Sequence, residues 1–366
     1  MNRSKRFLAM WVCALMLVGC KSGGGGKIGY VRTPMPVEEK TANDQGFATF
    51  WSRDLSVETR DQLTHAVQID ELIFTLEQPS NFLTAISIRD GKILWRRAIG
   101  TSFERFYRPQ RHGEEILINS VSQLYHLSIE NGDTLYVTHI DHPVNHAPAL
   151  TNRFAIFGSA DGNVFAHHLH SGFKQWDYDM PGQVLVSPVI SGFNVVAADS
   201  AGYYAILNSA TGVSIRKERT FGPITASPAV AGAIYIPSDD QKLYAIDSGT
   251  GRLQWNYVDK GPLRQTPVPL GNYVFVPLSG GGLVALDSAN GQNPLWRLEQ
   301  IAIPVRIEGN LLLLRMEQSL RWVELADGST ISEVSTVPLK ATIPGPNGSL
   351  ILISKRGHLQ RIDPLN

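Results

Sequence analysis

The chain has 366 residues, of which 43% are hydrophobic, 18% charged and 9% aromatic. This composition is typical of a folded globular protein and excludes a disordered, collagen-like or coiled-coil chain. Because 33 Lys and Arg residues balance 33 Asp and Glu residues, the overall charge provides no electrostatic attraction for nucleic acid.

The first twenty residues have the pattern of a bacterial lipoprotein export signal. Three basic residues precede an apolar run over residues 7–19. A helix needs about 20 apolar residues to cross a hydrocarbon core, so this run is typical of a cleaved signal. It ends in Leu-Val-Gly-Cys, which resembles the lipobox of lipoproteins. We expect residues 1–19 to be removed and Cys20 to carry acyl chains such as palmitate, which anchor the protein in the bilayer. An ordinary signal peptide with an incidental cysteine is the alternative.

Residues 20–45 are predicted to form the lipidated cysteine and a flexible tether. Four consecutive glycines occupy residues 23–26, and Pro34 and Pro36 favour extended backbone. A flexible coil of this length spans about 25–30 Å, which holds the body clear of the bilayer. Lys21, and not Asp, follows the lipidated cysteine. In the lipoprotein sorting pattern that this segment resembles, a residue other than Asp at this position favours the outer membrane. We therefore expect the folded body to face the periplasm.

Residues 46–366 carry an internal repeat of about forty residues. Glycines in similar turn settings recur at intervals of 41, 40, 40, 39, 40 and 37 residues, and prolines recur independently at intervals of 39, 40, 40, 39, 37 and 40. The two series are Gly91, Gly132, Gly172, Gly212, Gly251, Gly291 and Gly328, and Pro109, Pro148, Pro188, Pro228, Pro267, Pro304 and Pro344. Two interleaved series with one period indicate a single structural unit repeated along the chain.

One repeat is predicted to form four short antiparallel strands. After Pro228, an apolar strand is predicted over Ala233–Pro237, followed by alternating strands over Lys242–Asp247 and Arg252–Tyr257, with turn residues between them. Four strands in forty residues match a β-propeller blade. The proline fits the innermost strand, because proline lacks a backbone donor and is confined to the edges of sheets.

The number of blades and their closure follow from the spacing. Residues 47–366 number 320, and a mean glycine interval of 39.5 makes eight repeats. The last repeat lacks its outer strand, whereas residues 47–54 precede the first repeat and contain Trp51 five residues after a glycine. We therefore predict an all-β, eight-bladed propeller with four antiparallel strands per blade, closed by an N-terminal strand that completes the last blade. Deletion of residues 46–54 should open the ring, and deletion of residues 23–42 should be tolerated.

The position four residues before each glycine of the repeating series holds a hydrogen-bond acceptor. We interpret these residues as caps of the following turn and not as catalytic groups. They are Ser87, Ser128, His168, Asn208, Asp247, Asp287 and Glu324, with Asp363 equivalent in the last repeat.

The repeat resembles the pyrroloquinoline-quinone-type repeat, A-x-D-x-x-T-G-x-x-x-W. The full pattern is present from Ala245 to Trp255. Quinone-dependent alcohol dehydrogenases with this repeat hold their cofactor beside an adjacent cysteine pair and a calcium ion. Residues 46–366 contain no cysteine and no P-loop, G-x-S-x-G or H-E-x-x-H motif. We therefore predict no cofactor, no catalytic residue and no enzymatic activity.

The lipobox, the tether and the propeller together resemble the BamB family of lipoproteins in the outer-membrane β-barrel assembly machinery. The resemblance implies a monomeric, non-catalytic scaffold that binds a protein partner, the barrel-inserting subunit, and no nucleic acid. Two alternatives stay open. The propeller could bind another envelope ligand, such as a polysaccharide or a second lipoprotein, or it could be a quinoprotein enzyme.

Arginines and aromatic residues gather between the first two predicted blades. Both types of side chain are enriched at the anchors of protein interfaces, so we expect a partner-binding patch at the rim of the channel. A solvated blade edge is the alternative. The connection Pro262–Gln265 has the character of the family's partner-binding loops. The predicted contacts are Arg105, Phe106, Tyr107, Arg108 and Arg264.

Seven of the ten histidines lie between His126 and His170. The pair His139 and His142 has a spacing that could chelate zinc or copper with Asp141 or with His146. Local drift in composition explains the cluster more simply, and we predict no metal.

Overall fold

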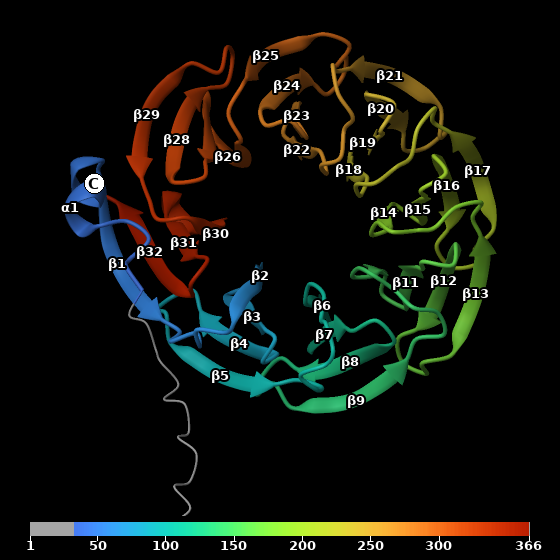
Figure 1. Ribbon diagram of the computed structural model, residues 1–366, viewed down its shortest axis with the longest axis horizontal. Helices are drawn as coiled ribbons and strands as arrows, with labels where there is room; N and C mark the ends of the chain where they lie inside the picture. Colours follow the sequence, from blue (N-terminus) through green and yellow to red (C-terminus); the bar gives the residue numbers. More distant parts are fainter. Residues whose placement is uncertain (1–32, 366) are drawn as a thin grey trace, which may run out of the picture.

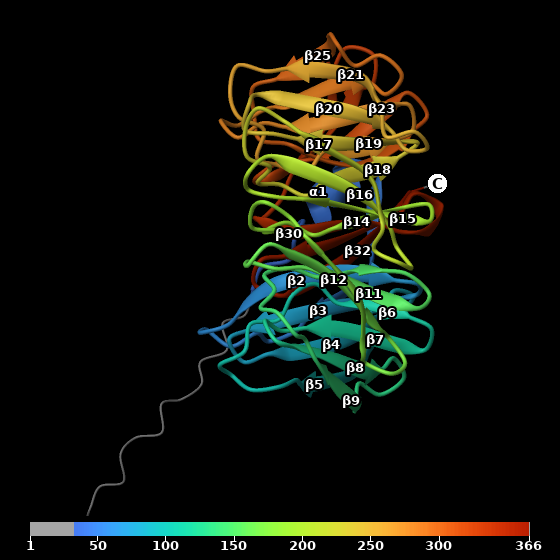
Figure 2. The same ribbon diagram turned by 90° about the vertical axis from the view of Figure 1, so that its right-hand side faces the viewer.

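The structure, a computed structural model that describes residues 33–365, is a ring of eight four-stranded antiparallel sheets (Figure 1). This confirms the predicted all-β, eight-bladed propeller. The predicted signal, residues 1–19, and Cys20 lie outside the described residues. Figure 2 shows the ring edge-on, with hairpins and connections on its two flat faces. Within residues 33–365, no helix is both long enough and apolar enough to cross a membrane.

In the first four blades, the chain runs from the innermost to the outermost strand. Blade 1 is β2 (Gln62–Ile69), β3 (Leu72–Gln78), β4 (Phe82–Ser87) and β5 (Ile93–Ala98); blade 2 is β6 (Gln110–His112), β7 (Glu115–Asn119), β8 (Gln123–Ser128) and β9 (Thr134–His139); blade 3 is β10 (Ala149–Leu150), β11 (Phe154–Gly158), β12 (Asn163–His168) and β13 (Lys174–Asp179); blade 4 is β14 (Val189–Ser191), β15 (Asn194–Ala198), β16 (Tyr203–Asn208) and β17 (Ser214–Arg219).

The other four blades have the same order of strands from the centre outwards. Blade 5 is β18 (Ala229–Ala231), β19 (Ala233–Pro237), β20 (Lys242–Asp247) and β21 (Leu253–Val258); blade 6 is β22 (Val268–Leu270), β23 (Tyr273–Pro277), β24 (Leu283–Asp287) and β25 (Pro294–Leu298); blade 7 is β26 (Ile303–Glu308), β27 (Leu311–Arg315), β28 (Ser319–Glu324) and β29 (Thr330–Ser335); blade 8 is β30 (Leu339–Pro344), β31 (Leu350–Ser354), β32 (His358–Pro364) and β1 (Phe47–Asp54), with a 3-10 turn at Pro346–Gly348.

The core lies in the seams between neighbouring blades. Eight clusters of buried apolar residues fill the eight seams. In one of them, Tyr235 and Trp255 of blade 5 pack with Val274 and Leu286 of blade 6. Each blade therefore buries its faces against two neighbours, and the closed ring supplies the core that one blade cannot.

The ring closes as predicted. Strand β1 pairs antiparallel with β32, from Phe47 opposite Pro364 to Asp54 opposite His358, with an irregularity between Thr49 and Trp51. Figure 1 shows the blue β1 beside the red β32. The first and last parts of the described chain thus share one blade, and β32 is paired on both sides, by β31 and by β1.

The prolines lie on or directly before the innermost strands, whose inner edges face the centre of the ring (Figure 1). Five of them come directly before an innermost strand, Pro304 lies within β26, and Pro344 ends β30. The missing proline donor therefore removes no bond from a sheet interior.

The predicted caps form at most repeats. Asp247 Oδ1 accepts from the N–H groups of Gly249 and Thr250, and Asp287 Oδ1 accepts from Ala289 and Asn290. Ser128, His168 and Asn208 make equivalent bonds. Asp363 instead accepts from the guanidinium of Arg361. The hydrogen bonds to the turn hold the pKa of the exposed Asp247 carboxyl below its ordinary value.

Five of the eight blades are joined to the next blade by a tryptophan on the outer strand. Each indole ring covers the repeat glycine of the following blade, and its Nε1 donates to a backbone carbonyl of that blade at 2.8–3.1 Å. A Cβ on the glycine would collide with the ring, so the close approach requires glycine. The pairs are Trp51–Gly91, Trp95–Gly132, Trp176–Gly212, Trp255–Gly291 and Trp296–Gly328.

Residues 33–45, which the sequence assigned to the flexible tether, pack against the outside of the ring (Figure 1). Helix α1 (Glu39–Asp44) contacts β1 and β29. The backbone of Val37 exchanges two hydrogen bonds with the side-chain amide of Gln360, at 2.8 and 2.9 Å. We therefore correct the boundary at residue 45, because the folded body includes Thr33 and the residues after it.

The contacts of Val37 predict that this segment contributes to stability, so deletion of residues 33–42 is no longer expected to be tolerated. Val37 is 1% exposed, and Val37→Ala should lower the free energy of unfolding by about 1–2 kcal/mol through two lost methyl groups and the space they leave. Urea denaturation measures this change. The matched control is Val213→Ala, at a side chain that is 64% exposed, which should leave the midpoint unchanged. Equal midpoints for the two variants would contradict the docking of this segment.

Candidate interaction face

All connections between consecutive blades lie on one flat face of the ring. Each blade has four antiparallel strands, so the chain leaves an outer strand at the same edge at which it enters the next innermost strand. The hairpins between second and third strands share this edge: Val184 N donates to Ser159 O at 2.9 Å, and Leu263 N donates to Ser238 O at 3.1 Å. We call this face the linker face. Its connections are residues 55–61, 99–109, 140–148, 180–188, 220–228, 259–267, 299–302 and 336–338.

A buried apolar side chain fixes each of six connections. These side chains are Phe106, Val144, Val184, Ile224, Leu263 and Ala302, each no more than 1% exposed. The ring of Phe106 packs edge-on against Tyr125, with centroids 5.2 Å apart. The sequence assigned Phe106 to a partner-binding patch, and the structure corrects this, because the side chain lies in the interior. The reason is its position: it wedges the connection into the seam between blades 1 and 2.

The same connections carry apolar side chains that point into solvent. Phe103 is 98% exposed, Leu185 41%, Phe221 89% and Ile301 64%. Single exposed apolar residues are common, and the opposite face also carries Phe173, Phe193 and Val213, which are 77%, 89% and 64% exposed. None of the four was among the predicted contacts. Each lies within three residues of the buried apolar side chain that fixes its connection.

The other predicted contacts lie on or near this face. Arg105 and Arg108 are exposed, and Tyr107 is half-buried with its hydroxyl donating to Val144 O at 3.3 Å. Arg264 is exposed and makes a bidentate pair with Asp239, at 3.1 and 2.9 Å. These hydrogen bonds from Arg264 to the carboxylate raise the pKa of the guanidinium, so the pair stays charged.

The innermost strands line two hollows at the centre of the ring. One, of ≈ 720 Å³, lies between blades 1, 6, 7 and 8, and Arg108 reaches it. The other, of ≈ 570 Å³, is lined mainly by blades 2 to 5, and Tyr107 and His65 contribute to it. The centre of the ring is therefore open to ligands of small-molecule size.

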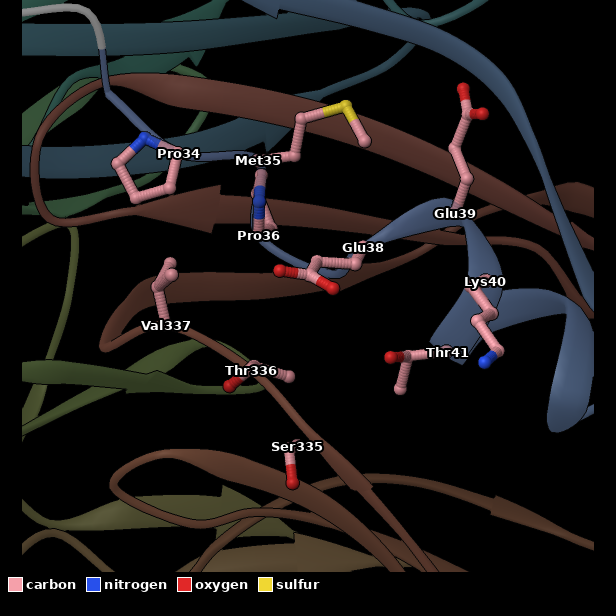
Figure 3. Close-up of a pocket in the computed structure, with 10 residues that line it drawn as sticks. All are labelled: Pro34, Met35, Pro36, Glu38, Glu39, Lys40, Thr41, Ser335, Thr336 and Val337. Atoms are coloured by element: carbon pink, nitrogen blue, oxygen red, sulfur yellow. The ribbon is translucent and has the colours of Figure 1, made fainter.

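A further hollow of ≈ 690 Å³ lies outside the ring, between the N-terminal segment and the end of β29 (Figure 3). Figure 3 shows residues 34–36 and 38–41 on one side and residues 335–337 on the other. Its charged groups are Glu38, Glu39 and Lys40, which belong to one wall. The two walls offer no convergent set of charges, so this hollow is a consequence of how the segment docks.

The histidines between blades 2 and 3 have separate partners. His142 Nδ1 lies 2.8 Å from Asp161, His146 is buried beside the carbonyls of Ala147 and Val184, and His167 Nδ1 lies 2.9 Å from Gly172 O. In the described chain, no three His, Cys, Asp or Glu side chains are grouped to hold a metal. Burial lowers the pKa of His146 and of His167, which keeps both rings neutral.

Comparison with known proteins points to one family. A family model described as "Outer membrane protein assembly factor BamB" matches residues 48–178, 79–219 and 182–364. A Yersinia pestis protein of that name is 23% identical over 313 residues, which cover 74% of this chain and 78% of that protein. A Shewanella oneidensis protein of the same name is 23% identical over 235 residues, which cover 56% and 58%.

Solved structures with the same fold have lower sequence identity. BamB from Moraxella catarrhalis superposes with a TM-score of 0.69 at 17% identity, over 87% of this chain and 97% of that one. Quinohemoprotein alcohol dehydrogenase from Comamonas testosteroni superposes with a TM-score of 0.68 at 12% identity, over 88% and 77%. At these identities the likeness establishes the propeller fold alone.

Proposed function

This chain belongs to the BamB family of outer membrane protein assembly factors, and from that membership we propose that it is a non-catalytic scaffold for assembly of outer-membrane β-barrel proteins. Its linker face holds a protein partner, the barrel-inserting subunit of the assembly machinery. The observation that carries this proposal is the set of four exposed apolar side chains on that face, with Phe103 and Phe221 the largest.

The exposed phenylalanines supply the binding energy in this proposal. Burying one such ring contributes about 1.5–3 kcal/mol, and a rigid surface loses little entropy when a partner binds. The buried wedges below the connections provide this rigidity. Arg105, Tyr107, Arg108 and Arg264 surround the apolar side chains as polar contacts, and the pair of Arg264 with Asp239 fixes one of them in advance.

A quinoprotein activity has weaker support. The fold is shared with a quinohemoprotein dehydrogenase, but the hollows at the centre of this ring are lined by no cysteine, and residues 46–366 contain none. The adjacent cysteine pair that those enzymes place beside the quinone therefore has no counterpart here.

The proposed location is the periplasmic side of the outer membrane, with the protein anchored through Cys20. The described chain enters the folded body at Thr33, whose hydroxyl donates to Asp54 at 3.2 Å. Asp54 ends β1 at the edge that leads into residues 55–61, which belong to the linker face. An anchor upstream of Thr33 would thus join the body near the side proposed to meet the partner.

Co-purification from detergent-solubilised membranes tests the proposal. The unaltered protein should recover the barrel-inserting subunit, and a double variant, Phe103→Asp with Phe221→Asp, should reduce recovery at least about tenfold, since each change places a charge where an apolar ring should be buried. The matched control is Phe173→Asp with Phe193→Asp. These side chains are 77% and 89% exposed and lie in hairpins of the opposite face.

The control separates a docking surface from a general effect of added charge. Full recovery with the control and loss with the linker-face variant supports the proposal. Equal recovery with both, or no subunit with the unaltered protein, contradicts it.

A further inference from the structure

Four basic side chains from different blades converge on the hollow of ≈ 720 Å³ at the centre of the ring. His65 comes from β2 of blade 1, Arg108 from the connection into blade 2, Arg315 from the end of β27 in blade 7, and Lys340 from β30 in blade 8. No residue that lines this hollow in the described chain is acidic. The sector is therefore a concentration of positive charge with no counter-charge on its walls.

The absence of a carboxylate partner is unusual within this molecule. Half-buried arginines elsewhere in the ring are paired: Arg96 lies 2.8 Å from Glu77, and Arg297 lies 2.6 Å from Asp259. Within residues 33–365, none of Arg108, Arg315 and Lys340 forms an ion pair. One nitrogen of Arg315 donates to the backbone carbonyl of Lys340, which holds the guanidinium against strand β30.

The charges of this group repel one another. Burial, followed by the nearby cations Arg315 and Lys355, lowers the pKa of Lys340. Burial, followed by Lys340, Arg108 and Arg105, lowers the pKa of His65 to about 4. Like charges held together in a partly desolvated site destabilise the fold unless an anion neutralises them.

A neutral polar group completes the lining. Thr342 follows Lys340 on β30 and borders the same hollow, and its buried Oγ1 has no hydrogen-bond partner among the described residues. This oxygen is enclosed by the protein, so the donors that a ligand in the hollow can reach are the basic side chains. Guanidinium and ammonium groups around one hollow are donors with which proteins bind phosphate oxygens.

We propose that this sector of the channel binds a phosphate group, either as free phosphate or as part of a small phosphate ester. A doubly charged tetrahedral anion suits three cations better than a single carboxylate does, and the volume is that of a small-molecule site. This inference goes beyond the proposed scaffold role, because it concerns the centre of the ring and not the apolar side chains of the linker face.

The bound phosphate would link the blades that close the ring. Blades 1 and 8 meet where the first and last parts of the described chain pair. The basic side chains around the hollow come from these two blades, from blade 7 and from the connection into blade 2. A ligand that contacts four blades at once stabilises the closed ring by mass action.

Thermal unfolding of the full-length protein in detergent, with phosphate titrated at constant ionic strength, tests the proposal. The melting temperature should rise with phosphate and saturate. Lys340→Met should raise the melting temperature without phosphate, since it removes repulsion, and should weaken the phosphate response at least about tenfold, as expected when a charged donor is lost. The control is Arg356→Gln, an exposed cation in a hairpin of the same blade, which should keep the full response.

A second readout does not depend on variants. The imidazole resonances of His65, assigned with His65→Asn, should shift on addition of inorganic phosphate to the unaltered protein. A parallel titration with glycerol 3-phosphate distinguishes the sources: tighter binding of the ester indicates a phosphate ester, and equal binding indicates free phosphate. An equal phosphate response in Lys340→Met, or His65 resonances that stay still, overturns the proposal.

Discussion

Deletion of residues 46–54 should abolish the cooperative unfolding of the propeller. The deletion removes the whole of β1, and β32 then presents an unpaired edge along its length. It also removes Trp51, which covers Gly91 and donates to Ile88 O at 2.9 Å, from the seam between blades 8 and 1. A ring with one open seam exposes the apolar surface of two blades, so we expect a broad transition and binding of a hydrophobic dye.

A circular rearrangement provides the control for this deletion. Leu365 N donates to Gly46 O at 2.7 Å, so the end of β32 already lies beside the start of β1. A chain in which residues 47–54 follow β32 through a short turn should restore the pairing as a hairpin, and cooperative unfolding with it. Circular dichroism during urea denaturation measures both chains. A sharp transition in the deleted chain, with an unchanged midpoint, would show that β1 is dispensable.

Trp255→Ala should lower the free energy of unfolding by about 3–5 kcal/mol, the range for large buried aromatic residues. Trp255 is 3% exposed, its ring covers Gly291 of the next blade, and its Nε1 donates to Ser288 O at 3.0 Å. The substitution leaves a cavity in the seam between blades 5 and 6 and leaves the carbonyl unpaired. Phe173→Ala, at an exposed aromatic residue, should change stability by less than about 0.5 kcal/mol.

A double-mutant cycle tests whether the ring and the glycine form one contact. Gly291→Val should destabilise by about 1–3 kcal/mol or more, because its side chain would collide with the ring of Trp255. Gly291 does not have the left-handed backbone conformation of Gly212, so steric contact and not backbone strain accounts for the loss. In the Trp255→Ala background the same valine meets a cavity, and its effect should shrink or reverse. Strictly additive effects in chemical denaturation would contradict the contact.

The strands were predictable from the sequence because local signals determine them. The predicted strands Ala233–Pro237, Lys242–Asp247 and Phe47–Asp54 agree with β19, β20 and β1 to the residue. Alternating side chains and turn residues are properties of a few neighbouring positions, and the period along the chain then counts the blades.

The candidate site was only partly predictable. Arg105, Arg108 and Arg264 lie on or near the linker face, but Phe106 belongs to the core, while Phe103, three residues earlier, is almost fully exposed. Both are phenylalanines in one short connection. Composition cannot distinguish them, because which ring enters the seam depends on how the neighbouring blade is placed.

The sequence by itself determined the number of blades, the strand that closes the ring and the turns that separate the strands. Only the tertiary structure decided that residues 33–45 dock on the ring, that five outer-strand tryptophans cover a glycine of the next blade, and that Arg108, Arg315 and Lys340 share one hollow. The physical reason is the range of the forces involved. Strands and turns follow from backbone preferences over a few residues, whereas seams and channel bring together residues that are far apart in the chain and meet only when the ring is closed.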